Sequence, residues 1–484
     1  MSLTSALSNA LSGLNTGARL AEIASENISN ALTEGFARRQ AQIASRQIGG
    51  IGAGVRIVSV ERQISQAIVQ DLRLANSIRS SIDPRLVALR SIETAFGDPT
   101  DASSLTAWLS SFQRSLTEAA ARPDSSARLL NVKDAAKNLV ASLNSASEAI
   151  AGSRQVADTA IERNVKTLNT AIRSVKDLNT QIAAMTARGQ DTSSAEDRRQ
   201  TLIDQIAEIV PVREVARQGN QVALFSTSGL ALLDGRAAVF SFSPTRAIQP
   251  DMTVESGGLS GLAVDGKPIS TGPEGGHLGQ GRLSAHFQIR DEDSVRQQRL
   301  VDDIAKSLIE RLSGPDVDPS LAAGEAGLFV DQDGTDISAD APGWASRITL
   351  NIVIADGSEE SIWRIRDGIH ATADPARSDP TLLQNFAQRL AEERPVPASA
   401  NQGAFSLFKL AAEAASTFAV QRLEAETNLS FSQARTEALK GDLLRDGVDS
   451  DREMQDLMQI EKAYAANAKV IQSVDDMLRA ILEI

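Results

Sequence analysis

Apolar residues recur at alternating spacings of three and four along the C-terminal segment of this 484-residue chain. That spacing is typical of one face of a helix in a coiled coil, so it predicts a helix of roughly 37 Å at 1.5 Å per residue. The face consists of Leu457, Ile460, Tyr464, Asn467, Ile471, Val474, Leu478 and Ile481. Asn467 is its polar member, and two interpretations of it stay open. It is either a buried amide that fixes the register of packing, or a helix end where the face loosens into solvent.

The N-terminal segment shows the same alternation, with smaller residues at several positions. Its face consists of Leu7, Leu11, Leu14, Ala18, Ala21, Ser25, Ile28 and Leu32. Small side chains let a partner helix approach closely, and neither terminal helix can bury its face alone. We therefore predict that the terminal helices pair with each other or with other copies of the chain. The predicted assembly interface consists of Leu7, Leu11, Leu14 and Ile28 together with the eight C-terminal residues.

Longer helical patterns fill much of the remaining chain. They cover residues 101–122, 124–188, 194–210, 291–312 and 406–444. Pro211 ends the third pattern, as expected for a residue that cannot continue a helix. The stretch "GDLLRDGVDSD" breaks the last pattern before the C-terminal helix begins.

Two segments have the character of β structure instead. Residues 212–290 contain short β-branched runs joined by Asp234-Gly235 and Asp265-Gly266, and Asp-Gly between apolar runs is a strong hairpin signal. The stretch "SRITLNIVIADGSEESIWRIRDG" predicts a further hairpin around Asp356-Gly357.

The order of these segments predicts an α+β multidomain fold. Long N- and C-terminal helices pair as a coiled-coil-like core, a helical second domain follows, and antiparallel β domains are inserted into it. The predicted domains are a terminal helical core of residues 1–75 with 445–484, a helical rod domain of 76–211 with 286–316 and 401–444, an inserted β domain of 212–285, and a second variable β-containing insertion of 317–400.

Composition excludes several classes of partner and site. The chain has 49 basic and 62 acidic residues and a net charge of −13, which argues against nucleic acid and against anionic membrane surfaces. It contains no cysteine, so disulfides and thiolate chemistry are impossible. No run of 18 apolar residues predicts a membrane span, and the N-terminus lacks the basic and apolar regions of a cleaved signal peptide.

The residues that carry catalysis or bind metals are sparse. His277, His286 and His370 are the only histidines, show no zinc spacing, and are expected on the surface or in loops. "GGHLGQGRL" (275–283) does not match a phosphate loop and predicts a turn into a helix. "DQDGTD" (331–336) lacks the glycine and glutamate positions of a calcium loop and predicts a polar turn. We therefore expect no catalytic residues, no metal and no cofactor.

The two ends carry the most specific motifs. "SENISNALTEGFARRQ" resembles the N-terminal signature of the bacterial flagellar rod and hook axial family, through Asn27, Ile28, Asn30, Thr33, Gly35 and Phe36. "GVDSDREMQDLMQIEKAYAANAKVIQSVDDMLRAIL" is similar to the family's C-terminal signature. The sequence also predicts that Gly35 ends the first helix in a left-handed conformation, with Phe36 folding back on the last turn. Asn27 and Asn30 share a helix face, from which they can bond to a neighbouring helix or to exposed carbonyls.

Three internal stretches narrow the resemblance to the hook-associated members of this family. They are residues 101–128, 197–225 and 275–292, in the same order as in those proteins. The sequence departs from the pattern at Gly281-Arg282, where the family more often has an apolar pair. Residues 318–400 resemble no part of the family that we can identify.

The resemblance implies a structural protein without catalytic activity, located outside the cell in the flagellum at the junction between hook and filament. It implies export in an unfolded state by the flagellar type III apparatus, with an export chaperone and without a cleaved signal. It also implies a ring of about eleven subunits whose terminal helices form the inner core of the tube. The implied partners are other copies of the chain, the hook protein and a second junction protein.

Two alternatives stay open. One is another flagellar axial protein, either the second junction protein or a rod component. The other is a secreted enzyme or adhesin that uses flagellar-type ends for export, with its activity in residues 318–400.

Overall fold

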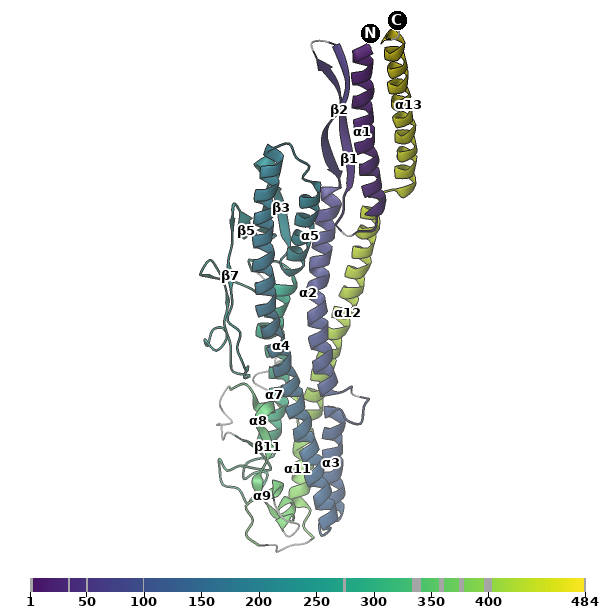
Figure 1. Ribbon diagram of the computed structural model, residues 1–484. Helices are drawn as coiled ribbons and strands as arrows, with labels where there is room; N and C mark the ends of the chain where they lie inside the picture. The colour runs from purple at the N-terminus through teal and green to yellow at the C-terminus, as the bar shows by residue number, and fades with distance from the viewer. Residues whose placement is uncertain are drawn as a thin grey trace.

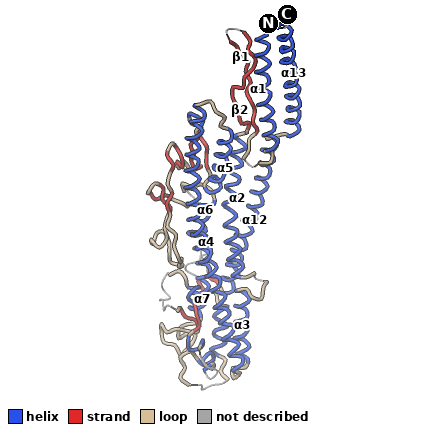
Figure 2. Tube along the Cα trace, viewed as in Figure 1, coloured by secondary structure: helices blue, strands red, loops and turns tan. Residues whose placement is uncertain are grey.

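The computed structural model describes residues 3–33, 35–48, 51–98, 100–272, 276–332, 341–356, 361–373, 378–395 and 403–482. The molecule is elongated, and both chain ends lie together at one end of it (Figure 1). We call that end, made of the first and last helices and a β hairpin, the terminal unit. The long helices that continue from it form the helical body, with small sheets and loops along one side (Figure 2).

The terminal unit consists of α1 (Leu3–Ser29), α13 (Ser450–Leu482) and a hairpin of β1 (Arg38–Ile48) and β2 (Ile51–Gln63). The helices lie side by side, and the antiparallel hairpin packs against α1 (Figure 1). The terminal helices are therefore observed as predicted, whereas the sequence analysis missed the hairpin. Its signal is the pair Gly49-Gly50 between two alternating segments, since such a pair is typical of tight hairpin turns.

Besides the segment that ends in α7 (Ser294–Arg311), five helices of at least 17 residues build the helical body in the described part of the chain. They are α2 (Gln66–Phe96), α3 (Leu105–Ala121), α4 (Ser126–Ala187), α5 (Ser193–Ile209) and α12 (Leu407–Arg445). Four of them match the predicted patterns closely, and the hydroxyl of Ser104 caps α3 by accepting a hydrogen bond from the Ala107 amide at 3.2 Å. The fifth, α2, was not predicted, and the boundary predicted between residues 75 and 76 lies inside it.

A further helical segment packs along α4 and against α12. It consists of α6 (Arg282–Gln288), a π-helical turn at Ile289–Asp293 and α7 (Ser294–Arg311), so it begins nine residues before the predicted start. A Cβ at Gly281 would lie 2.5 Å from the Ile209 carbonyl oxygen. Close backbone packing therefore requires glycine at the position where this sequence departs from the family pattern.

Residues 212–269 form two small antiparallel sheets against α4 and α5. The strands are β3 (Val212–Ala216), β4 (Val222–Ser226), β5 (Ala231–Asp234), β6 (Arg236–Ala237), β7 (Phe240–Ser241), β8 (Leu262–Val264) and β9 (Lys267–Ile269), with a 3-10 turn at Gln218–Asn220. Both predicted Asp-Gly turns are confirmed. The turn between β8 and β9 places Asp265 at φ 50° and Gly266 at φ 80°, as a two-residue hairpin turn requires.

The segment between α7 and α12 has more helix than predicted. Its elements are β10 (Phe329–Asp331), α8 (Trp344–Arg347), β11 (Ile348–Leu350), α9 (Ile352–Ala355), α10 (Arg364–Asp367), α11 (Thr381–Ala391), β12 (Arg394–Pro395) and β13 (Ala404–Phe405). The hairpin predicted around Asp356-Gly357 is wrong, because β11 pairs with β10 instead. The Asn351 side chain then caps α9 by accepting a hydrogen bond from the Val353 amide at 3.1 Å. Gly357 itself lies outside the described residues.

Two hydrophobic cores hold the body together. One joins the ends of α2, α3, α7 and α12 to the first half of α4, and also contains side chains such as Phe329, Ile365 and Phe386. The other joins the second half of α4 and α5 to the small sheets. Residues between α7 and α12 thus pack into the same core as the long helices. The predicted boundaries at 317 and 400 stay a prediction.

Candidate assembly surface

Small residues of α1 face α13. A Cβ at Gly13 would lie 2.6 Å from Nδ2 of Asn467, and a Cβ at Gly17 would lie 3.6 Å from the ring of Tyr464. Ala10 and Ala24 are buried on the same helix. The two helices approach closely because α1 has almost no side chain at the points of contact.

These contacts fix an antiparallel register. Gly13 meets Asn467, and fourteen residues further along α1 the Asn27 amide meets Glu453. The helix-end interpretation of Asn467 is wrong, because α13 continues to Leu482. Asn467 is half-buried, with its amide packed directly over Gly13.

The predicted interface residues divide into three groups by exposure. Val474 is buried, at 4% exposure. Half-buried are Leu7, Leu14, Ile28, Leu457, Ile460, Asn467 and Ile471. Exposed are Leu11, Tyr464, Leu478 and Ile481. Pairing within one chain therefore leaves much of the predicted apolar face uncovered, and the role of these residues between copies stays a prediction.

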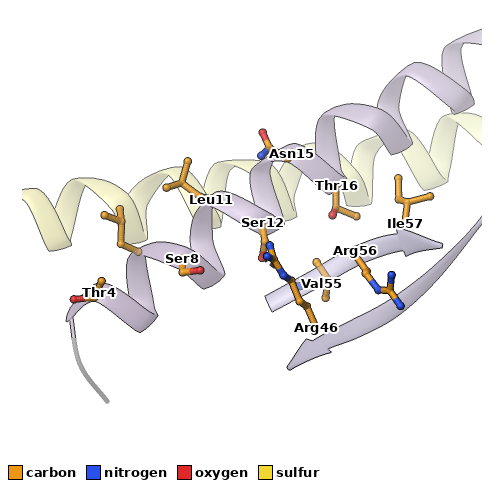
Figure 3. Close-up of a pocket in the computed structure, with 11 residues that line it drawn as sticks. Thr4, Ser8, Leu11, Ser12, Asn15, Thr16, Arg46, Val55, Arg56 and Ile57 are labelled. Atoms are coloured by element: carbon orange, nitrogen blue, oxygen red, sulfur yellow. Dashed lines mark hydrogen bonds between the residues drawn. The ribbon is translucent and has the colours of Figure 1, made fainter. Parts of the chain in front are cut away.

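A groove of about 580 Å³ runs between α1 and the hairpin (Figure 3). The predicted interface residues Leu7 and Leu11 line it from α1, and Val55 and Ile57 line it from β2. Its other lining residues are Thr4, Ser8, Ser12, Asn15, Thr16, Arg46 and Arg56. The Val55 amide donates a hydrogen bond to the Ser12 hydroxyl at 3.2 Å, which holds the hairpin to α1 at this level.

Asn27 joins three elements of the terminal unit. It is 1% exposed, its Oδ1 accepts from the Arg39 amide at 2.9 Å, and its Nδ2 donates to the Arg39 carbonyl at 2.9 Å. Nδ2 also donates to Glu453 of α13 at 3.1 Å. Glu453, itself 3% exposed, accepts from Nε of Arg38 at 2.6 Å. The bonds of this signature residue thus lie within one chain, to the neighbouring helix and a carbonyl of the hairpin.

Arginines of the hairpin connect the terminal unit to the helical body. Arg39 lies 3.3 Å from Asp197 of α5, and Nε of Arg62 donates to the same carboxylate at 2.8 Å. Arg39 also pairs with Glu26 of α1. The two contacts with Asp197 fix the hairpin base against the start of α5, and the contact with Glu26 fixes it against α1.

The remaining signature residues form the turn after α1. The Thr33 hydroxyl donates to Oδ1 of Asn30 at 3.2 Å, and the Phe36 amide donates to the Thr33 carbonyl. Gly35 has φ 81°, which confirms the predicted left-handed residue, although α1 ends earlier, at Ser29. The guanidinium of Arg39 lies 5.1 Å from the centre of the Phe36 ring. Ile28 is half-buried.

The sequence analysis missed a group of exposed methionines on α13. Met454, Met458 and Met477 are between 48% and 50% exposed. They fall outside the predicted a/d face, so the search for a single face could not find them. Exposed apolar side chains that form a contiguous patch are typical of surfaces that bind a partner.

Among the described residues, no three His, Asp or Glu side chains gather closely enough to hold a metal ion. The expectation that His286 lies on the surface is wrong, because it is 8% exposed within α6. Burial, with Arg282 and Arg163 nearby, lowers its pKa to about 4. Asp331 accepts a hydrogen bond from Arg347, and the rest of the predicted "DQDGTD" turn from residue 333 lies outside the described residues.

None of the helices in the described part of the chain combines the length and apolar character that crossing a bilayer requires.

Comparison with known proteins matches the helical body and the C-terminal end to two separate families. Residues 89–314 match the family described as the flagellar hook-associated protein FlgK helical domain, and residues 443–484 match the flagellar basal body rod FlgEFG protein C-terminal family. Flagellar hook-associated protein 1 of Salmonella typhimurium is 26% identical over 307 residues, covering 61% of this chain and 53% of the relative. Its Escherichia coli counterpart is 24% identical over 304 residues, covering 61% and 54%. The chain spans about half the length of these curated relatives.

A solved structure gives a weaker likeness. The flagellar hook junction protein FlgK from Burkholderia pseudomallei has a TM-score of 0.44 and 17% identity, covering 54% of this chain and 46% of that one.

Proposed function

Because the chain belongs to the family of flagellar hook-associated proteins, we propose that it is a structural subunit of the bacterial flagellum that forms the junction between hook and filament. It works outside the cell, as a building block and not as an enzyme. Its partners are other copies of itself, the hook protein and a second junction protein.

The observation that carries this proposal is the uncovered apolar surface of the terminal unit. Leu11, Met454 and Met458 are between 47% and 50% exposed although they lie on helices already paired within the chain. Burying the exposed half of each such side chain contributes about 1 kcal/mol. A unit that gains this burial only from neighbours favours a polymer subunit over a free-standing protein.

The shape of the molecule supports the same proposal. The terminal unit lies at one end of an elongated body, with both chain ends together (Figure 1). Copies that associate through these units form a central core, and their bodies extend away from it. We propose a ring of about eleven such copies, delivered unfolded by the flagellar type III apparatus with an export chaperone.

Loss of the gene tests the junction role. Cells without this chain are expected to build complete hooks and to release flagellin into the medium as unpolymerised monomer. Expression of the intact chain should restore filaments, which controls for effects on neighbouring genes. Filaments of normal number and length in the deletion strain would contradict the proposal.

A further inference from the structure

The groove between α1 and the hairpin has a distinct charge. Among the described residues that line it, the charged ones are Arg46 and Arg56, and both are exposed (Figure 3). Residues 3–18 of α1 carry no charge at all. The α1 side of the groove is therefore uncharged, with Leu7 and Leu11 among hydroxyl and amide side chains, and it lies beside two guanidinium groups. Its occupant should be an apolar helix face flanked by carboxylates.

Such a face lies at the start of α13. Asp451, Met454, Met458 and Glu461 are spaced i, i+3, i+7 and i+10, which places them along one side of the helix. All four are exposed, and the two methionines are 49% and 50% exposed. Lys462 lies at one edge of this face. The exposed carboxylates of Asp446 and Asp449 lie in the turn before α13 and precede this face in the sequence. We call Asp451, Met454, Met458 and Glu461 the methionine stripe.

We propose that the groove of one copy binds the methionine stripe of a second copy, an inference that rests on the proposed function. Met454 and Met458 insert between α1 and β2 against Leu7 and Leu11, and the carboxylates of the stripe meet Arg46 and Arg56. Methionine suits this contact because its unbranched side chain adapts to an irregular groove. The contact uses different surfaces on the two copies.

The two surfaces cannot meet within one copy. Glu453 lies level with Asn27, whereas the groove extends along α1 only from Thr4 to Thr16. The middle of the stripe therefore lies about fourteen residues, or roughly 20 Å at 1.5 Å per residue, from the middle of the groove. A neighbouring copy brings them together when it is displaced by this distance along the helix axis. Contacts between unlike surfaces add copies in one direction and close into a ring or extend as a helix.

A second exposed row on α13 is the competing occupant. It contains Val470, Met477 and Ile481 near the end of the helix. Two carboxylates lie near it, Asp475 and Asp476, and Asp475 is paired with Arg479 at 3.0 Å. The methionine stripe, with an exposed carboxylate at each end, offers the better charge match to Arg46 and Arg56. The crosslinking experiment distinguishes the two rows.

Cysteine crosslinking tests the contact directly, because the full chain has no cysteine of its own. Leu11→Cys in one population and Met458→Cys in another should form a mixed disulfide about tenfold faster than a control pair. The control combines Met458→Cys with Val87→Cys, an exposed position on α2. Equal rates for the two pairs would overturn the proposal. Faster crosslinking of Leu11→Cys to Met477→Cys than to Met458→Cys would overturn it too, in favour of the second row.

Charge reversal tests the role of the guanidinium groups. Arg46→Glu with Arg56→Glu, or Asp451→Lys with Glu461→Lys, should each slow the Leu11–Met458 crosslink about tenfold. Mixing the two reversed chains, or placing all four changes in one chain, should restore it. Reversal of Arg236 and Lys267, which lie on the small sheets, should leave the rate unchanged. Failure of the paired reversals to restore crosslinking would exclude the charge match.

The same variants separate this inference from the proposed function. If cells with the reversed groove assemble normal filaments and the reversed chain crosslinks like the original, the inference fails and the junction role stands. If cells that lack the chain entirely still assemble filaments, the junction role itself fails.

Discussion

Asn27→Ala should detach the hairpin and α13 from α1 locally. The substitution removes three hydrogen bonds, two to the Arg39 backbone and one to Glu453, at a site that is 1% exposed. At about 1 kcal/mol for each bond, the local free energy of opening falls by about 3 kcal/mol. That corresponds to roughly a hundredfold increase in the open population.

Hydrogen exchange of the backbone amides in β1 and α13 measures this opening residue by residue. The matched control is Asn30→Ala, three residues along the same helix. Asn30 is only half-buried, and its amide bonds locally, to the Glu26 carbonyl at 2.9 Å and to the Ser29 hydroxyl. Loss of the Asn30 side chain should change the hydrogen-exchange rates in the hairpin by less than threefold, which corresponds to about 0.6 kcal/mol in the free energy of opening. If both variants accelerate exchange in β1 and α13 equally, Asn27 does not join these elements as argued.

Three further substitutions test the body and the turn after α1. His286→Gln should remove a pH dependence of the free energy of unfolding. Burial lowers the pKa of His286 in the folded protein to about 4, so the unfolded chain takes up this proton before the folded protein does as the pH falls. The original protein should therefore lose about 3 kcal/mol as pH falls from about 6.5 to about 4, and equal urea midpoints for both proteins across this range would contradict the assignment. Asp158→Ala leaves the fully buried guanidinium of Arg290 without its 2.6 Å partner, so urea unfolding should show a loss of about 3 kcal/mol. Gly35→Ala forces φ 81° on a residue with a Cβ that would lie 2.6 Å from the Thr201 hydroxyl. It should lower the melting temperature more than Gly229→Ala, which has φ 90° and open space.

The sequence predicts helices well where one apolar face repeats. In α4, apolar residues separated by three or four positions are buried along the whole helix, so burial and periodicity agree. In α2 they do not agree, because its buried face includes Arg73, Ser77 and Ser80, and Pro84 lies inside it. A search for apolar periodicity cannot find a helix whose packing face is partly polar. The strand prediction for residues 348–355 fails for another reason, because Asn351 caps a short helix within this apolar segment.

The assembly surface could be predicted only in part. The sequence identifies both terminal helices and the residues with bulky side chains on α1. It does not show that Gly13 and Gly17 form the contact with α13, because close packing needs a partner such as Asn467 at the matching level. Once the small residues face α13, Leu7 and Leu11 are left to line the outer groove. The pairing of α1 with a particular face of α13 depends on three-dimensional register, which one sequence does not specify.

The terminal unit is the part of the chain that we propose joins the flagellum. Binding of the purified chain to isolated hooks, measured by co-sedimentation, tests this against a chain that lacks residues 450–484. We predict that the full chain sediments with the hooks. The shortened chain should stay in solution while its helical body melts at an unchanged temperature. Equal binding of the two chains would contradict assembly through the terminal unit.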